Sequence, residues 1–394
     1  MDKKNKLVKI GIMAFMPMVV GDCIIFSVII NFLKDNFKKQ PFKIYLFINR
    51  DNIAICNLMY KKYIEEGSLV LIHHKILNGY KIKKIIDIKN YFRFVLKIRR
   101  LKLDYFFNFK FDSDSKDSNS KWRFFTKLLG FPSKNNFYHE TFIAEEYTDG
   151  QFIYWHKHLK PLIWYKHMAV QFVEFLNHQF NTTIPLRTIE LDYETFKPKV
   201  FKKPTIGFFI GTSDSRKTYH PHRWAEIFDY IKKKYKDKYQ IICFGHGEMN
   251  DKLFDIFKES VAKLGYCDGL DYINMTSKND LKTDMEYCAS LDLAITQDSG
   301  FMHVASVFKI KTISIFGFSS SDTFMSQFGN DNNYYPSVSK LACSPCNDVG
   351  SCPYKVIYKG LTFTECLMIK RDDIFDKIDN ILSKETIINN NVIS

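Results

Sequence analysis

The residues best suited to chemistry lie in the sequence LDLAITQDSGFMHVASVFKIKTISIFG, which covers residues 291–317. An apolar run leads into Asp298, Ser299 and Gly300, and a helical pattern follows that carries His303 in its first turn. Ser is a favoured N-cap residue, and Gly lets another backbone approach closely. The free amides and the positive dipole at such a helix start attract an anion. An ordinary strand–turn–helix with a capping Ser299 and a partly buried His303 explains the same pattern, so spacing alone leaves both interpretations open.

Two further segments put polar residues directly after strand-like runs. In TIGFFIGTSDSRK, Thr212 and Ser213 follow an apolar run, and Lys217 comes four residues after Ser213. Hydroxyls and an ammonium group suit the oxygens of a phosphate. In CFGHGE, Glu248 follows paired glycines at another strand end, where a carboxylate commonly accepts ribose hydroxyls. The helix dipole explains a Glu at the start of a helix equally well.

The N-terminal segment joins a basic start to an apolar run from Ile10 to Ile30, as a signal peptide or membrane anchor would. Pro17, Gly21 and Asp22 interrupt that run, and an acidic residue costs about 2.5–3.5 kcal/mol at the centre of a bilayer. No small-residue cleavage site follows. We therefore expect a soluble protein with a buried strand, a loop up to Asp22 and an apolar helix from Cys23. Asp22 can then be a helix N-cap, a reactive carboxylate at a strand end, or both.

Four of the nine cysteines crowd into one segment with the spacing C-x2-C-x5-C-x13-C: Cys343, Cys346, Cys352 and Cys366. Four thiolates suit tetrahedral Zn or Fe, and an ion with all four positions filled would be structural. Reduced structural thiols, or disulfides formed on isolation, explain the spacing as well. An odd total without a regular framework indicates a reducing, cytoplasmic setting.

The elements that must position these residues follow an alternating pattern. Short apolar runs separated by amphipathic stretches indicate βαβ units and parallel sheets, whose ligands bind beyond the carboxyl ends of the strands. The strand-like runs are residues 8–13, 43–48, 68–73, 104–109, 205–210, 239–244, 291–296 and 312–316. The helical patterns include residues 80–100, 222–234, 248–264 and 300–308.

The alternation occurs twice, and residues 181–203 between the two blocks carry two prolines without periodicity, as a linker would. We predict an α/β protein with one domain over residues 1–185 and another over residues 200–394. The final helix is expected either in the second domain or back on the first. A cleft between two such domains is the expected ligand site.

Composition excludes several classes of protein. With 394 residues, 46% of them apolar and 25% charged, the chain is globular rather than disordered or fibrous. Its net charge of +14 favours anionic partners such as phosphates or an anionic membrane face. A nucleic-acid-binding protein would also be basic, but the chain carries no aromatic-rich binding motif and no recognition helix, so we expect no nucleic-acid partner.

The three-residue pattern D-x-D, which binds a metal in some enzymes, occurs at Asp112-Ser113-Asp114. It lies in the sequence DSDSKDSNS, an acid- and Ser-rich patch in which solvation explains the acidic residues. After a strand-like run it could also face an acceptor. We assign no metal to it.

Together these segments resemble family 9 glycosyltransferases, the bacterial ADP-heptose heptosyltransferases of lipopolysaccharide synthesis. The hallmark D-[ST]-G-x-x-H, followed by an apolar helix and a strand that ends in F-G, is DSGFMH…TISIFG here. The family's hydroxyl pair and Lys match Thr212-Ser213 and Lys217, its W-x-E helix matches residues 224–226, and its G-D pair matches Gly21-Asp22. Residues 218–221 look inserted and Pro17 replaces a small polar residue, which bears on sugar and acceptor specificity.

The resemblance implies a GT-B architecture, in which two Rossmann-like parallel-sheet domains face a central cleft. The N-terminal domain would bind the acceptor and the C-terminal domain the nucleotide sugar. Asp22 would be the general base. The donor would be held by Thr212, Ser213 and Lys217 at the diphosphate, Glu248 at the ribose, and Asp298, Ser299, Gly300 and His303 around the phosphates and sugar.

The expected activity is an inverting, metal-independent transfer of heptose from ADP-heptose to a lipopolysaccharide or lipooligosaccharide core, an anionic glycolipid. Lys217 and the helix start supply positive charge for the leaving diphosphate. The enzyme would be cytoplasmic, with peripheral contact at the inner membrane. The alternatives are a protein heptosyltransferase that acts on an autotransporter, a transferase of another nucleotide sugar, and a nucleotide-binding module without catalysis. The first is suggested by the four cysteines, because autotransporter heptosyltransferases are similar in using a four-cysteine finger for iron.

Overall fold

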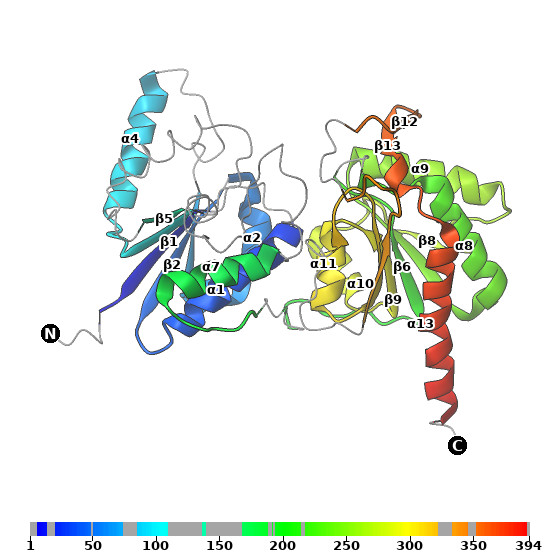
Figure 1. Cartoon of the computed structure of the whole chain (residues 1–394), viewed down its shortest axis with the longest axis horizontal. Helices are drawn as coiled ribbons and strands as arrows, with labels where there is room; N and C mark the ends of the chain where they lie inside the picture. The colour runs from blue at the N-terminus through cyan, green and yellow to red at the C-terminus, as the bar shows by residue number, and fades with distance from the viewer. Residues whose placement is uncertain are drawn as a thin grey trace. The chain divides into compact units, whose positions relative to one another are not determined.

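The computed structural model describes residues 6–13, 20–48, 50–73, 85–108, 136–138, 168–187, 191, 194–213, 217–321, 333–345 and 352–391. The chain divides into two compact units, Met1–Ile189 and Glu190–Ser394, which run from blue to green and from green to red in Figure 1. Asp112-Ser113-Asp114, Pro17 and Cys346 lie outside the described residues.

The first unit is built on a parallel sheet with the strand order β3-β2-β1-β4-β5. Its strands are β1 Val8–Met13, β2 Phe42–Ile48, β3 Leu69–His73, β4 Tyr105–Asn108 and β5 Asn136–Tyr138. β1 lies in the middle, and Ile10 and Ile12 are fully buried. Gly11 is required between them, because a Cβ there would lie 2.6 Å from the side chain of Leu103 and 2.7 Å from that of Phe106.

Helices cover this sheet. They are α1 Val20–Asn36, α2 Ile53–Met59, α3 Lys61–Glu65, α4 Ile85–Arg99 and α7 Met168–Phe180, with a 3₁₀ turn at Arg50–Asn52. α1 and α7 lie side by side (Figure 1), and the rings of Phe26 and Phe172 meet edge-on with centroids 6.1 Å apart. Because α1 is apolar on nearly all sides, it forms the centre of this helix layer.

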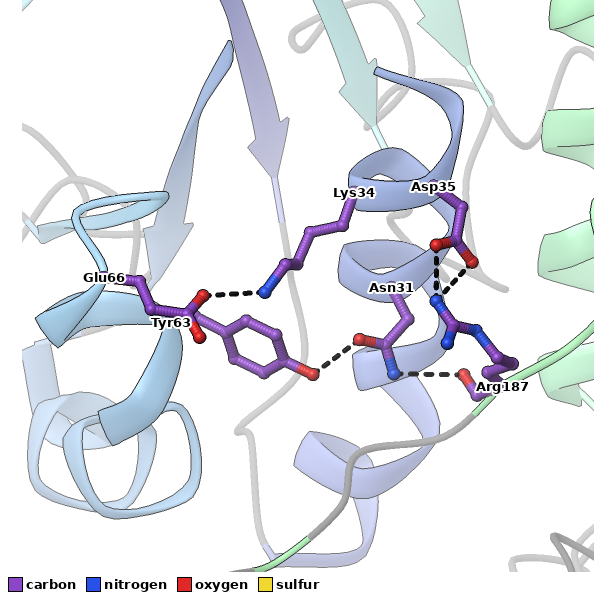
Figure 2. A network of polar contacts seen from close by, with 6 residues as sticks. All are labelled: Asn31, Lys34, Asp35, Tyr63, Glu66 and Arg187. Carbon is purple, nitrogen blue, oxygen red and sulfur yellow. Dashed lines mark hydrogen bonds and ion pairs between the residues drawn. The ribbon is translucent and has the colours of Figure 1, made fainter. Parts of the chain in front are cut away.

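Polar contacts fix the second half of α1 (Figure 2). The Tyr63 hydroxyl donates to the Asn31 Oδ1 at 2.6 Å, and the Asn31 Nδ2 donates to the carbonyl oxygen of Arg187 at 3.4 Å. The Arg187 guanidinium pairs with the Asp35 carboxylate. These bonds tie α1 to α3 and to the segment after α7.

The second unit contains a parallel sheet with the order β11-β10-β9-β6-β7-β8. Its strands are β6 Thr205–Phe209, β7 Gln240–Phe244, β8 Ile273–Asn274, β9 Leu293–Gln297, β10 Lys311–Phe316 and β11 Tyr334–Val338. β7 and β8 follow β6 toward one edge of the sheet, and β10 and β11 follow β9 toward the other edge. The strand order therefore reverses between β6 and β9, the place where doubly wound sheets bind their ligands.

The helices of this unit are α8 Pro221–Tyr235, α9 Glu248–Ala262, α10 Leu281–Cys288, α11 Gly300–Val307 and α13 Arg371–Asn391, with 3₁₀ turns at Lys236–Lys238 and Glu365–Leu367. An antiparallel hairpin joins β12 Lys355–Tyr358 and β13 Leu361–Thr364. α13 packs on α8: the rings of Tyr230 and Phe375 stack with centroids 3.9 Å apart, and Asp379 accepts from Tyr230 and Tyr235 at 2.7 Å each. Within the described residues, no helix combines the length and apolar character needed to cross a membrane.

The structure confirms the predicted α/β class with a parallel sheet in each half. All eight strand-like runs are strands, with ends that differ by at most two residues. The sequence missed β5 and β8, which are only three and two residues long, the two strands β12 and β13 of the hairpin, and β11, which contains Pro336. Proline argues against a strand except at a sheet edge, and β11 is an edge strand.

Candidate functional site

The carboxyl edge of the second sheet gathers polar side chains where the strand order reverses. The segments that follow β6 and β9 carry Lys217 and Asp298. The Lys217 Nζ lies 3.2 Å from the Asp298 Oδ2 and 5.5 Å from the centre of the Phe318 ring, which follows β10. Three strand ends therefore meet around one ammonium group.

The hydroxyl pair after β6 has one buried and one exposed member. Thr212 is buried, and its Oγ1 lies 3.3 Å from the Thr218 Oγ1. Ser213 is exposed. Gly211 precedes them because a Cβ at that position would lie 1.2 Å from the Asn250 Oδ1. Of the two hydroxyls, that of Ser213 is open to a ligand, and that of Thr212 packs within the loop.

The start of α11 differs in one respect from the sequence prediction. Ser299 takes the N-cap position with extended backbone angles, but its side chain makes no capping bond. Its Oγ lies 3.1 Å from the Thr296 Oγ1 at the end of β9 instead. A hydroxyl held by the preceding strand leaves the first amides of α11 without that cap, and such amides suit an anion.

His303 lies in the same helix and is buried, with 5% of its surface exposed. The pKa of its imidazole is lowered to about 4, mainly by burial; the Asp298 charge opposes the shift, and the Lys217 charge adds to it. The imidazole is therefore neutral near pH 7, and its pKa depends on the charges of Lys217 and Asp298. The structure thus brings Lys217, Asp298 and His303 together.

Glu248 is not part of this group in the structure. It begins α9 with an exposed side chain, and its Oε1 lies 2.7 Å from the Lys252 Nζ one turn further on. This hydrogen bond lowers the pKa of the Glu248 carboxyl. The helix-start explanation accounts for Glu248 as it stands here, and contact with a ribose stays a prediction.

Sequence reasoning missed Asn250, which connects the loops after β6 and β7. Its Nδ2 donates to the carbonyl oxygens of His246 at 2.6 Å and Thr212 at 3.4 Å. Its Oδ1 and the Oγ1 of Thr276 are buried with no hydrogen-bond partner among the described residues. Both side chains flank Gly245, whose Cβ would lie 3.1 Å from Asn250 and 3.3 Å from Thr276. A polar residue one turn after a glycine-rich strand end was the signal available in the sequence.

Gln297, the last residue of β9, was also missed. It is fully buried and hydrogen-bonded on both sides of its amide. The sequence ended the strand one residue earlier, at Thr296, so Gln297 counted as loop. A polar residue between an apolar run and Asp298 was its only local signal.

Asp22 belongs to the first unit. α1 begins at Val20, so Asp22 lies in its first turn rather than in a loop or at an N-cap before Cys23, and that part of the prediction was wrong. Gly and Asp are poor residues for a helix interior but are accepted in the first turn, where the dipole favours a carboxylate. Asp22 is half-buried, and the helix that carries it follows β1, which neighbours β4 at the reversal point of this sheet.

The described cysteines of the C-terminal segment have different surroundings. Cys343 is exposed and Cys352 is half-buried, with its Sγ 3.7 Å from the carbonyl oxygen of Tyr354. Cys366 is buried, and its Sγ lies 3.2 Å from the Thr364 Oγ1. In the part of the chain that is described, which lacks Cys346, no three metal-ligating side chains gather. These thiols alone do not form an ion site, and a four-cysteine site stays a prediction.

Two parallel sheets, each with a reversal point, and a cluster of polar side chains at one of them define the class as a two-unit α/β protein of the GT-B type. Residues 151–355 match glycosyltransferase family 9 (heptosyltransferase), and the chain belongs to that family. The resemblance identified from the motifs is thereby confirmed, and so is the predicted fold class.

Several known proteins are similar to this chain. Lipooligosaccharide heptosyltransferase 2 of Campylobacter jejuni subsp. jejuni serotype O:6 is 28% identical over 199 residues, which cover 48% of this chain and 58% of that protein. The match thus spans little more than half the length of this curated relative.

Among solved structures, the ADP-heptose lipopolysaccharide heptosyltransferase II of E. coli has a TM-score of 0.60 at 14% identity, covering 96% of this chain and 100% of the other. The dodecameric iron-containing heptosyltransferase TibC of E. coli, in complex with ADP-D-beta-D-heptose, has a TM-score of 0.53 at 12% identity, covering 96% of this chain and 77% of the other. At such identities the likeness concerns the fold.

Proposed function

We propose that this chain is an inverting glycosyltransferase that moves heptose from ADP-heptose to the core of a lipopolysaccharide or lipooligosaccharide. The observation that carries the proposal is the Lys217–Asp298 pair at the reversal point of the second sheet, directly before α11. A diphosphate at this edge would meet the Lys217 ammonium and the first amides of α11. Family membership and the Campylobacter relative, a lipooligosaccharide heptosyltransferase, support the same donor and acceptor classes.

The proposed chemistry is a single displacement. The Asp22 carboxylate takes the proton of the acceptor hydroxyl, the hydroxyl oxygen bonds to the anomeric carbon of the heptose, and the bond from that carbon to the diphosphate oxygen breaks. A single displacement of this kind inverts the anomeric configuration. Lys217 and the start of α11 stabilise the charge on the leaving ADP, so the proposed chemistry needs no metal ion.

The neighbours of Lys217 have supporting roles in this proposal. Asp298 holds the ammonium group in place before the donor binds, at 3.2 Å. A diphosphate would compete for the same ammonium and weaken that pair. His303, which is neutral near pH 7, can exchange a hydrogen bond with a phosphate or sugar oxygen without adding charge. The acceptor would be an anionic glycolipid at the inner face of the cytoplasmic membrane, which the net charge of +14 favours.

A donor screen tests this function. We expect ADP and ADP-heptose to raise the Tm of the whole chain more than UDP-, GDP- or CMP-sugars do, since a ligand at 100 times its Kd stabilises a protein by about 2.7 kcal/mol. A transfer assay with lipooligosaccharide core and with an autotransporter protein then identifies the acceptor. Transfer to the protein alone would favour a protein heptosyltransferase, ADP binding without transfer would indicate a binding module, and a larger shift with another nucleotide would contradict the proposed donor.

The four cysteines carry a separate prediction, that Cys343, Cys346, Cys352 and Cys366 hold one structural Zn or Fe. We expect about one ion per chain in protein purified without an affinity metal, and chelation should lower the Tm before it lowers activity. Cys352→Ser should lose the ion, whereas Cys267→Ser, an exposed thiol outside the segment, should keep it. Metal-free protein of full stability would mean that the cysteines are ordinary thiols.

A further inference from the structure

Gln297 touches both ends of the segment that carries the predicted phosphate-binding residues. Its Nε2 donates to the carbonyl oxygen of Ile210 at 2.5 Å, and its Oε1 accepts from the backbone N–H of Tyr219 at 2.6 Å. Ile210 directly precedes residues 211–218, and Tyr219 directly follows them. One side-chain amide at the end of β9 therefore bonds the residues on either side of this segment.

The orientation of this amide is forced by its partners. A carbonyl oxygen can only accept and a backbone N–H can only donate, so the Gln297 oxygen must face Tyr219 and its nitrogen must face Ile210. All three residues are buried, and a buried polar group that loses its partner is costly. An uncharged side chain of this length with a donor and an acceptor at its tip is needed here: Asn is one methylene shorter, and an ionised Glu cannot donate.

The same amide is linked to the candidate chemistry through its neighbours in the chain. Lys217 precedes Tyr219 by two residues, and its ammonium contacts Asp298, which directly follows Gln297. Both partners of the ion pair are thus attached to the bonded ends at Tyr219 and Gln297. The pairing of β6 with β9 fixes the strands themselves, and the two bonds of Gln297 extend that fixation to Tyr219, two residues from Lys217.

We propose that Gln297 is a positioning residue for the departure of the diphosphate: it holds Ile210 and Tyr219 together and thereby sets where the Lys217 ammonium lies relative to α11. This rests on the proposed function. Charge stabilisation in a transition state depends on donors held in place beforehand, and an error of about 1 Å can cost about 100-fold in rate. The effect belongs mainly to kcat, because the charge on the leaving group develops only as the bond breaks.

A double-mutant cycle separates this role from plain stability. We expect Gln297→Met to lower kcat by about 10–100-fold with a much smaller change in the KM for ADP-heptose. In a Lys217→Ala background the same change should lower kcat by no more than about threefold, because the positioned group is already gone. Thr312→Val is the matched control. It removes a buried hydroxyl that bonds the carbonyl oxygen of Ile310 at 2.8 Å near the amino end of β10, and it should leave kcat unchanged.

Gln297→Glu is a second variant that tests the same role if Gln297→Met does not fold. A protonated Glu can donate to Ile210 and accept from Tyr219 as Gln does, whereas the ionised form cannot donate. Burial should raise the pKa of this carboxyl. The activity of the variant relative to the wild type should therefore rise as pH falls and decline as pH rises, while the relative activity of Lys217→Ala should show no such recovery at low pH.

The outcomes distinguish this inference from the proposed function. If the wild type transfers sugar but the Gln297 and Lys217 effects multiply fully, or the Gln297→Glu ratio does not change with pH, Gln297 has no positioning role. If the wild type transfers no sugar, the proposed function fails. The positioning role, which concerns the departure of the diphosphate, then fails with it, whereas active wild-type enzyme with multiplying effects overturns the positioning role alone.

Discussion

Asp22→Asn should lower turnover by about 10²–10⁴-fold while the protein keeps its fold and its affinity for ADP. Asn has nearly the shape of Asp but cannot take a proton from the acceptor hydroxyl. Its cost to stability should be small, because a carboxylate in the first turn of a helix contributes about 0.3–1 kcal/mol through the dipole. The rate of transfer at saturating donor and acceptor, measured beside the Tm and the Kd for ADP, checks this.

The same helix offers a matched control. Asp35 lies near the end of α1 and pairs with Arg187, as Figure 2 shows. Asp35→Asn removes one carboxylate from the same helix and breaks a surface ion pair, which is usually worth less than about 1 kcal/mol. It should leave turnover unchanged. If Asp22→Asn also transfers sugar at the normal rate, Asp22 is not the base, and its role is confined to the start of α1.

The architecture could be predicted because each buried strand is marked by a local pattern in the sequence. Buried parallel strands are short apolar runs, and β1, β6 and β7 were found for that reason to within one residue. β8 has too few residues to show a period, and the structure extends β9 to Gln297, a polar residue that the pattern assigns to a loop. The sequence predicted that the sheets are parallel but not the order of their strands, because the neighbours of β6 are decided by packing between distant segments.

The candidate site was predictable in its residue types and only partly in its geometry. Strand ends and helix starts pointed to Lys217, Asp298 and His303, which the structure brings together. The capping role of Ser299 could not be excluded from sequence, because it depends on a competing hydroxyl three residues earlier. The contacts of Gln297 could not be predicted, because its partners lie 87 and 78 residues away in the chain and a local pattern contains no information about them.

Lys217→Ala should reduce kcat by about 10²–10³-fold, the range found when one preorganised donor to a developing charge is removed. Affinity for ADP should fall much less, because the diphosphate of the ground state carries less charge toward Lys217 than the leaving group does. The change also leaves the Asp298 carboxylate without its 3.2 Å partner beside an incoming diphosphate. Adding Asp298→Asn should therefore restore part of the affinity for ADP without restoring the rate.

Lys233→Ala is the matched control for lost positive charge. Lys233 lies on α8 in the same unit, is exposed, and pairs with Asp229 at 2.8 Å, so its removal costs one surface ion pair and no contact at the carboxyl edge of the sheet. Its kcat and its Kd for ADP should match the wild type, because exposed charges more than about 10 Å apart are largely screened in 0.1 M salt. Equal losses of kcat and of affinity for ADP in the two Lys variants would mean that the net charge of the protein, and not the position of Lys217, determines both. An unchanged rate in Lys217→Ala would mean that the leaving diphosphate is stabilised elsewhere and that the carboxyl edge of the second sheet is not the donor site.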